Sequence, residues 1–213
     1  MTHRDRRDGV TLLLVRHGRC ADGAAGLIPR RTSTLCDEGR AQIIRLARSW
    51  SGQPPQLLFA SDLARSHKSA EILAREWHVP LEIDSRLAEA SFGKWEGQSW
   101  TLVTEADARA FRRWSRRWAT HSPPEGESLP ELCGRVSAWT NGLLERADCG
   151  STVVAVTHAG VVRAMLITLM DIAPKVAFGF GVAPATVTSF VVGRGTDKRW
   201  CEVAFVNSDS FQC

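Results

Sequence analysis

The sequence predicts an α/β fold with a mostly parallel central sheet and an antiparallel C-terminal hairpin at one edge of it. Three short apolar runs each stop abruptly at polar residues, as buried parallel strands do where they deliver side chains to the carboxyl edge of a sheet. Segments with helical spacing separate these runs, and two further apolar runs joined by a turn come near the C-terminus. We therefore expect one domain over residues 11–213, preceded by a disordered or poorly ordered tail at residues 1–10.

Composition restricts the classes of partner. The chain has 213 residues, of which 44% are hydrophobic and 23% charged, as is typical of a globular protein with a sizeable core. Its formal net charge of +4 is too small to indicate nucleic-acid binding and suits a small anionic substrate. No apolar run is long enough for a membrane span, and no export signal precedes Thr11. We expect a cytoplasmic protein that acts on a small metabolite, with neither nucleic acid nor membrane as partner.

The six cysteines are scattered, at positions 20, 36, 133, 149, 201 and 213. They show neither a C-x-x-C spacing nor a cluster typical of metal ligands. We expect reduced thiols, with Cys213 at the terminus the most prone to cross-linking. A zinc site built from His17, His158 and a carboxylate is the alternative, but no ligand spacing supports it, so neither a metal nor a cofactor is predicted.

The first strand, Thr11 to Val15, ends at Arg16-His17-Gly18 and so places a guanidinium and an imidazole side by side. Residues 19–35 follow as a loop without periodicity, and a loop of this length in a compact domain is usually functional. Because the loop carries Arg19, Arg30 and Arg31, we expect it to form a wall facing the substrate. For any one of these arginines, simple exposure to solvent is an equally good interpretation.

The pattern of the first strand then repeats. A helix starts at Asp37 and ends near Ser51, and the second strand, Leu57 to Ala60, stops at Ser61-Asp62. The next helix, from about Leu63 to Trp77, carries Arg65 in its first turn, where backbone N–H groups favour an anion. A third strand over residues 81–84 leads into the irregular segment 86–100, which contains Glu89.

Residues 101–120 have helical spacing, with Phe111, Trp114 and Trp118 on one side. The segment also carries arginines at positions 109, 112, 113, 116 and 117. We favour an amphipathic helix that covers the domain, with its aromatic residues inward and its arginines in solvent. The alternative, which belongs to another class of protein, is a basic module that binds RNA or lipid through this face.

The last third of the chain supplies a second histidine. A helix from Ser128 to about Ala147 starts with a capping box formed by Ser128 and Glu131. The strand Thr152 to Val156 then ends at Thr157-His158, a helix covers residues 161–170, and the hairpin spans residues 186–192 and 200–206. Because the carboxyl ends of parallel strands meet at one edge, Arg16-His17, Ser61 and His158 are expected to converge there.

These residue types suit a phosphomonoester. Arg16 and Arg65 each offer a bidentate fork to phosphoryl oxygens. His17 is the best nucleophile, because neutral imidazole is nucleophilic near neutral pH once its Nδ1–H is bonded to a backbone carbonyl. His158 would donate to the phosphoryl oxygens. A carboxylic acid must then protonate the leaving oxygen and activate water, and on spacing alone Glu89 is no better a candidate than Glu96 or Glu82.

Five blocks in this order resemble the histidine phosphatase (phosphoglycerate-mutase-like) superfamily. They are Leu14-Val15-Arg16-His17-Gly18, residues 61–65 with 70–73, residues 87–89 with 92–97, Pro124-Glu125-Gly126-Glu127-Ser128, and residues 156–163. The resemblance implies a three-layer α/β/α sandwich and a metal-independent phosphomonoesterase. It also implies roles for single residues: His17 as phosphoacceptor, Arg16, Arg65 and His158 as phosphate clamp, Glu89 as proton donor, and Ser61 near the clamp.

Within that superfamily, residues 92–97 and 124–128 look most like the α-ribazole phosphatases and broad-specificity phosphatases. The chain departs from the common family pattern at Arg19-Cys20, at Gly23 and at residues 33–36. Candidate substrates are α-ribazole phosphate, sugar phosphates and phosphoglycerates. The alternative within the family is a phosphoglycerate mutase. We expect a monomer or a homodimer.

Overall fold

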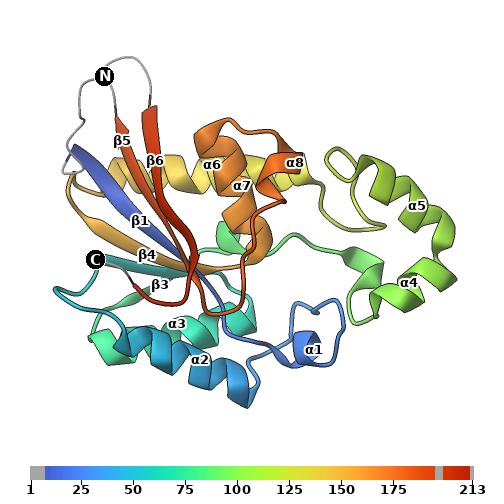
Figure 1. Ribbon diagram of the computed structural model, residues 1–213, viewed down its shortest axis with the longest axis horizontal. Helices are drawn as coiled ribbons and strands as arrows, with labels where there is room; N and C mark the ends of the chain where they lie inside the picture. Colours follow the sequence, from blue (N-terminus) through green and yellow to red (C-terminus); the bar gives the residue numbers. More distant parts are fainter. Residues whose placement is uncertain (1–7, 195–198, 212–213) are drawn as a thin grey trace.

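The computed structural model describes residues 8–194 and 199–211, and within them it has one six-stranded sheet in the order β3-β2-β4-β1-β5-β6 (Figure 1). Strands β1 to β4 pair in parallel, whereas β5 pairs antiparallel with β1 and with β6. The strands are β1 (Gly9–Arg16), β2 (Leu57–Ala60), β3 (Leu81–Ile83), β4 (Thr152–Thr157), β5 (Val187–Arg194) and β6 (Arg199–Ser208). The mostly parallel sheet with an antiparallel hairpin at one edge is confirmed.

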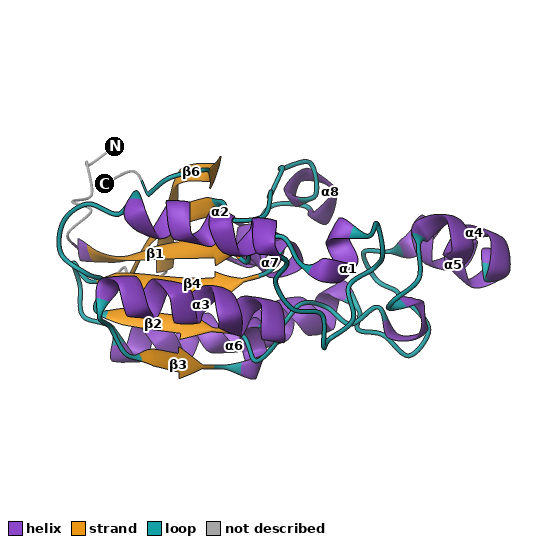
Figure 2. Ribbon diagram, turned by 90° about the horizontal axis from the view of Figure 1, so that it is seen from below, coloured by secondary structure: helices purple, strands orange, loops and turns teal. Residues whose placement is uncertain are grey.

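Helices cover both faces of this sheet (Figures 1 and 2). On one face lie α2 (Asp37–Arg48) and α3 (Ala64–Trp77), and on the other lie α6 (Leu129–Arg146) and α7 (Ala159–Met170). Each face has its own buried core, and β4 contributes to both, with Val153 and Ala155 on the α6–α7 side and Val154 and Val156 on the α2–α3 side. A strand buried on both faces reads as a continuous apolar run, which is why this segment was recognisable in the sequence.

Helices α4 (Trp100–Ala106) and α5 (Ala108–Arg117) project from one end of the sheet (Figure 2). The single helix predicted for residues 101–120 is therefore wrong, because the chain breaks at Asp107. The Asp107 carboxylate accepts a 2.9 Å hydrogen bond from the Trp95 indole N–H, a contact between distant parts of the chain that periodicity cannot reveal. As predicted, Phe111 and Trp114 pack inward on Trp95, and the five arginines of this segment are exposed.

Several boundaries differ from prediction. Strand β1 begins at Gly9, so Gly9 and Val10 belong to the sheet rather than to the predicted tail; residues 1–7, like Cys213, lie outside the described residues. The predicted loop 19–35 contains the short helix α1 (Ala21–Ala24). A further short helix, α8 (Pro174–Ala177), follows α7.

Two other features bear on the expectations. The capping box of α6 is confirmed, since Ser128 and Glu131 exchange the two expected hydrogen bonds. The five cysteines that fall in the described part of the chain are free. Over residues 8–194 and 199–211, no helix combines the length and the apolar character that crossing a membrane requires.

Candidate active site

The carboxyl ends of β1, β2 and β4 meet at one edge of the sheet. Arg16 pairs with Thr157 and Ala60 pairs with Val156, so His17, Ser61 and His158 each follow directly on neighbouring strand ends. The imidazole rings of His17 and His158 lie 4.9 Å apart between centroids. Two histidines that are 141 positions apart in the sequence thus share one site, because parallel pairing aligns the ends of their strands.

His17 is held in one tautomer. Its Nδ1 lies 2.6 Å from the Gly18 carbonyl oxygen, which can only accept, so Nδ1 carries the proton. The Nε2 lone pair accepts a hydrogen bond from the Arg65 Nε–H at 3.2 Å. Burial, and then the positive charge of Arg65, lowers the pKa of His17 from 6.5 to about 3. His17 is therefore a neutral imidazole near pH 7, with its unshared electron pair on Nε2.

His158 is completely buried and is oriented by Ser61. The Ser61 hydroxyl lies 2.7 Å from His158 Nε2 and accepts the Leu63 N–H at 3.4 Å. A hydroxyl that donates to Nε2 leaves the proton of neutral His158 on Nδ1, which has no hydrogen-bond partner among the described residues. Burial, and then the closeness of the His17 ring and of the Arg65 charge, lowers the pKa of His158 well below its usual value. Ser61 thus fixes the orientation of the His158 ring.

Arg16 and Arg65 are both largely buried. Arg65 donates from Nη1 to the Arg30 carbonyl at 2.9 Å, and Arg16 donates from Nη1 to the Val182 carbonyl at 2.5 Å. The buried Nε of Arg16 has no partner among the described residues. A buried donor without an acceptor costs about 1–3 kcal/mol, so this edge of the sheet favours an anion that supplies one.

Glu89 lies at the same edge, where β4 gives way to α7. Its carboxylate accepts hydrogen bonds from the backbone N–H groups of Gly160 at 3.2 Å and Ala90 at 3.1 Å. Burial lowers the pKa of Arg16 and of Arg65, and in both cases the negative charge of Glu89 opposes that shift. Of the two rivals, Glu82 forms an exposed ion pair with Arg146, and Glu96 accepts from Ser91. Glu89 is the carboxylate that contacts the start of α7 beside His158.

Position 160 requires a glycine, although no pattern in the sequence indicates this. A Cβ at this position would lie 2.2 Å from Oε1 of Glu89. The Gly160→Ala protein is therefore expected to displace the Glu89 carboxylate and to lower kcat by about a hundredfold, since a displacement of about 1 Å can have that effect. Steady-state hydrolysis of a phosphomonoester measures it. Gly134→Ala, where a Cβ meets nothing within 4 Å, is the control and should keep full activity.

The arginines of the predicted wall form ion pairs with carboxylates of neighbouring segments. Arg19 pairs with Glu38 at 2.9 Å, Arg30 with Asp22 at 3.0 Å, and Arg31 with Asp62 at 3.4 Å. Arg30 reaches the site through its backbone, because its carbonyl accepts from Arg65. A wall that contacts substrate through these side chains stays a prediction. Asp22, which holds Arg30, carried no signal in the sequence.

The lowered pKa values make stability depend on pH. His17 has a lower pKa in the folded chain than its ordinary 6.5, so below about pH 6.5 the unfolded chain binds more protons. Unfolding free energy should be constant above that pH and fall as the pH drops toward 3. Between about pH 6.5 and 5, His17 alone accounts for about 2 kcal/mol of the loss. Urea titrations at both pH values test this.

The matched variants for that test are His17→Asn and His78→Asn. His78 is exposed and directly follows α3. Its backbone has the left-handed conformation, which asparagine also adopts readily. The first substitution should weaken the pH dependence, and the second should leave it unchanged. Equal pH dependence in all three proteins would contradict a neutral, buried His17.

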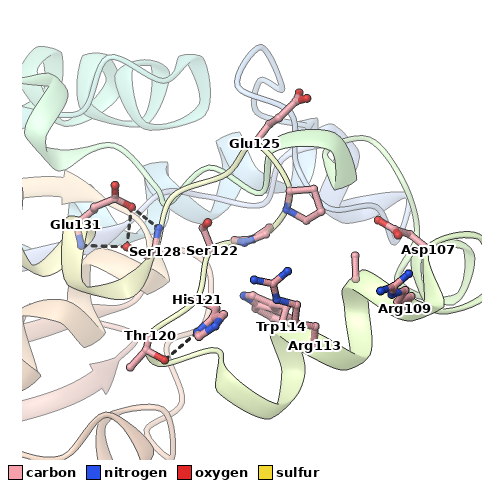
Figure 3. A pocket seen from close by; sticks show the side chains of 13 residues that line it. Asp107, Arg109, Arg113, Trp114, Thr120, His121, Ser122, Glu125, Ser128 and Glu131 are labelled. Atoms are coloured by element: carbon pink, nitrogen blue, oxygen red, sulfur yellow. Dashed lines mark hydrogen bonds between the residues drawn. The ribbon is translucent and has the colours of Figure 1, made fainter.

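No group of three or more potential metal ligands is present in the part of the chain that the structure describes. A cavity of about 780 Å³ lies beside α5 (Figure 3). It is lined by residues such as Arg113, Trp114 and Glu131 and includes none of His17, Arg16, Arg65 and His158. The catalytic candidates are therefore defined by the strand ends and not by this cavity.

Comparison with known proteins identifies the family. The family model of the histidine phosphatase superfamily (branch 1) matches residues 12–204. The glucosyl-3-phosphoglycerate phosphatase of Mycolicibacterium vanbaalenii is 30% identical over 170 residues, which cover 76% of this chain and 74% of that protein. The adenosylcobalamin/alpha-ribazole phosphatase of Escherichia coli is 26% identical over 172 residues, which cover 80% and 84%.

Solved structures share the fold. The alpha-ribazole phosphatase from Shigella flexneri superposes with a TM-score of 0.84 at 22% identity, covering 95% of this chain and 98% of that one. A structure of the mycobacterial glucosyl-3-phosphoglycerate phosphatase with VO3 superposes with a TM-score of 0.83 at 24% identity, covering 93% and 99%. With a family model that spans most of its length and relatives that are named phosphatases, this chain is a phosphatase that belongs to branch 1 of the histidine phosphatase superfamily.

Proposed function

We propose that this phosphatase hydrolyses a small phosphomonoester in two steps, through a phosphohistidine at His17. The observation that carries the proposal is the convergence of two buried guanidinium groups and two neutral imidazoles at one edge of the sheet. Such a site supplies a nucleophile and fixed positive charge together. The phosphoryl oxygens would be bound by Arg16, Arg65 and His158, since the buried Arg16 Nε and His158 Nδ1 have no partner within the described residues.

In the first step, the Nε2 lone pair of His17 attacks phosphorus and the ester P–O bond breaks. Arg65 must first release the Nε2 atom of His17. Its Nε–H then donates a hydrogen bond to a phosphoryl oxygen instead. Glu89, which lies beside Gly160 at the start of α7, enters this step as the carboxylic acid, having taken up a proton as the anionic phosphoryl group binds, and it gives that proton to the leaving oxygen. The products are phospho-His17 and the free alcohol.

In the second step, water attacks the phosphorus of phospho-His17 and the N–P bond breaks. Glu89, now a carboxylate, takes a proton from that water. The hydrogen bond from His17 Nδ1 to the Gly18 carbonyl keeps the ring in the same orientation while the electron pair returns to Nε2. Inorganic phosphate leaves, and every group is back in its starting protonation state. Each step uses groups of this chain alone.

Three classes of candidate substrate are suggested by the relatives and by the resemblance to the family. The named relatives act on glucosyl-3-phosphoglycerate and on adenosylcobalamin or α-ribazole phosphate, and a further relative is named for phosphoserine. The candidates for this chain are α-ribazole phosphate, other sugar phosphates and phosphoglycerates. The small metabolite is proposed as the one partner, and the chain acts as a monomer or a homodimer without a cofactor.

The experiment is a chemical trap of the intermediate. Denaturing the enzyme during turnover of a ³²P-labelled phosphomonoester should leave label that is stable to alkali and labile to acid, on the peptide that contains His17. EDTA should leave turnover unchanged. Label that survives acid, or activity abolished by EDTA, would contradict the scheme.

The same assay separates the two alternatives. A phosphoglycerate mutase would isomerise phosphoglycerate faster than it releases phosphate once a bisphosphoglycerate primer is added. A basic module would instead show salt-sensitive binding to RNA or acidic lipid, lost when the exposed arginines of α5 are neutralised, with His17→Asn having no effect. Trapped label on His17 together with phosphate release that is faster than isomerisation in the presence of the primer excludes both as the main activity.

A further inference from the structure

A small cavity of about 140 Å³ opens directly beside Glu89. Both Glu89 and Gly160 line it, so it starts where the leaving oxygen of a substrate would lie in the proposed reaction. The rest of its lining is mostly apolar and comes from residues 90–92, from residues 114–132 and from the segment around α7 and α8. These side chains include Trp114 and Trp118 of the α5 segment, Leu129 and Leu132 of α6, and Phe178 at the end of α8.

The aromatic part of this lining is firmly packed. The rings of Trp118 and Phe178 lie 4.4 Å apart between centroids, and the guanidinium of Arg163 lies 5.1 Å from the centroid of the Phe178 ring. Phe178 nevertheless remains 39% exposed. An aromatic side chain that stays partly open beside an apolar cavity gains by covering itself with another apolar surface.

The size of the cavity limits what it can hold. An apolar cavity of about 150 Å³ in a protein interior is large enough for a single benzene ring. A ring attached one or two carbons from the ester oxygen would therefore fill this cavity while the phosphoryl group stays at the clamp.

Alcohols that carry a negative charge are disfavoured on the other side of Glu89. A second cavity that reaches Glu89, about 400 Å³, is lined by the carboxylates of Glu125, Glu127 and Glu131 as well as Glu89. Its two arginines are already engaged, Arg135 with Glu127 at 2.7 Å and Arg31 with Asp62 at 3.4 Å. An alcohol with its own carboxylate, such as glycerate, would meet like charge on this side.

The polar side chains that line the apolar cavity besides Glu89 are Ser91, His121, Glu127 and Arg163. Arg163 donates from Nη2 to the Phe180 carbonyl at 3.2 Å, whereas its buried Nε has no partner within residues 8–194 and 199–211. That N–H would bind an acceptor on the ring, such as a hydroxyl or carbonyl oxygen. The lining thus combines an apolar body with a few polar groups, which is the usual composition of a specificity site.

We infer that the preferred substrates are phosphomonoesters of alcohols that carry an aromatic ring close to the ester oxygen, with the ring bound between Trp118, Phe178 and the leucines of α6. The inference rests on the proposed function, because it places the leaving oxygen at Glu89. The cavity of about 780 Å³ beside α5 shares Trp114 and His121 with this site.

The test compares three phosphate esters of primary alcohols: 2-phenylethyl phosphate, glycerol 1-phosphate and 3-phosphoglycerate. Because all three leaving groups are primary alkoxides, differences in kcat/KM report binding of the alcohol rather than intrinsic reactivity. We expect kcat/KM for the phenylethyl ester to be about tenfold to hundredfold higher than for the other two, the range that burial of one phenyl ring provides. Equal values, or a preference for 3-phosphoglycerate, would overturn the inference.

Substitutions in the cavity test where the aromatic ring of the substrate binds. Trp118→Ala should reduce the preference for the phenylethyl ester over glycerol 1-phosphate about tenfold, and Trp118→Phe should keep most of it. Phe178→Ala provides a second reading if Trp118→Ala does not fold. Leu102→Ala removes an exposed apolar side chain of α4 that lies outside the cavity, and it should leave the ratio unchanged. An unchanged ratio in both aromatic-to-alanine variants would place the ring elsewhere.

Failure of this inference differs from failure of the proposed function. If none of the three esters labels His17, the proposed function is wrong. If the esters label His17 but show no aromatic preference, the phosphohistidine reaction stands and the assignment of the cavity is wrong.

Discussion

The His17→Asn protein is expected to lose phosphatase activity by about four orders of magnitude or more. Asparagine keeps an N–H that can donate to the Gly18 carbonyl, but it has no lone pair equivalent to Nε2. Without a nucleophile the covalent step has no route, and removal of a catalytic nucleophile costs about 10⁴-fold to 10⁶-fold in kcat. Phosphate release and the trapped label should disappear together.

Two controls show whether this loss comes from the nucleophile alone. The clamp should persist in His17→Asn, so calorimetry should still detect binding of inorganic phosphate through Arg16, Arg65 and His158. His78→Asn changes an exposed residue just after α3, and this protein should keep full activity. Activity in His17→Asn within tenfold of the parent would show that another group accepts the phosphoryl group.

The Arg65→Lys protein is expected to lose about two to three orders of magnitude in kcat. Lysine keeps the charge but loses the planar fork that donates to His17 Nε2 and to the Arg30 carbonyl at the same time. Loss of one oriented donor to a transition state costs about 10²-fold to 10³-fold. Single-turnover measurements should place the deficit in the formation of phospho-His17, with a smaller change in its hydrolysis.

The matched control is Arg75→Lys, which lies on the same helix in an exposed position. It should behave as the parent in rate and in urea unfolding. Arg65→Lys is also expected to unfold at similar urea concentrations, because the positive charge beside Glu89 is kept. If kcat for Arg65→Lys stayed within severalfold, the bidentate fork would have no part in the transition state.

Much of the site could be predicted because its residues sit directly after strands. An apolar run that ends in Arg16-His17-Gly18 or in Thr157-His158 is a local pattern, and parallel pairing then brings such ends to one edge without further information. The break at Asp107 could not be predicted in this way. Asp107 accepts a hydrogen bond from Trp95, twelve residues earlier, whereas residues 101–120 keep helical spacing across the break.

The choice of the proton donor among three glutamates also needed more than local sequence. On spacing, Glu82, Glu89 and Glu96 were equivalent, and only the resemblance to a family favoured Glu89. The structure separates them by their partners, because Glu82 pairs with Arg146, Glu96 accepts from Ser91, and Glu89 bonds to the start of α7. Partners of this kind come from other elements of the fold, so no local window of sequence contains them.

The sequence by itself determined the order of strands and helices and the identity of the groups that can clamp and attack a phosphoryl group. These follow from periodicity and from residue type, which are properties of short segments. Only the tertiary structure decided the tautomer and the lowered pKa of His17, the pairing of Ser61 with His158, and the apolar cavity beside Glu89. Each of these depends on burial and on contacts between distant segments, and burial is set by packing of the whole chain.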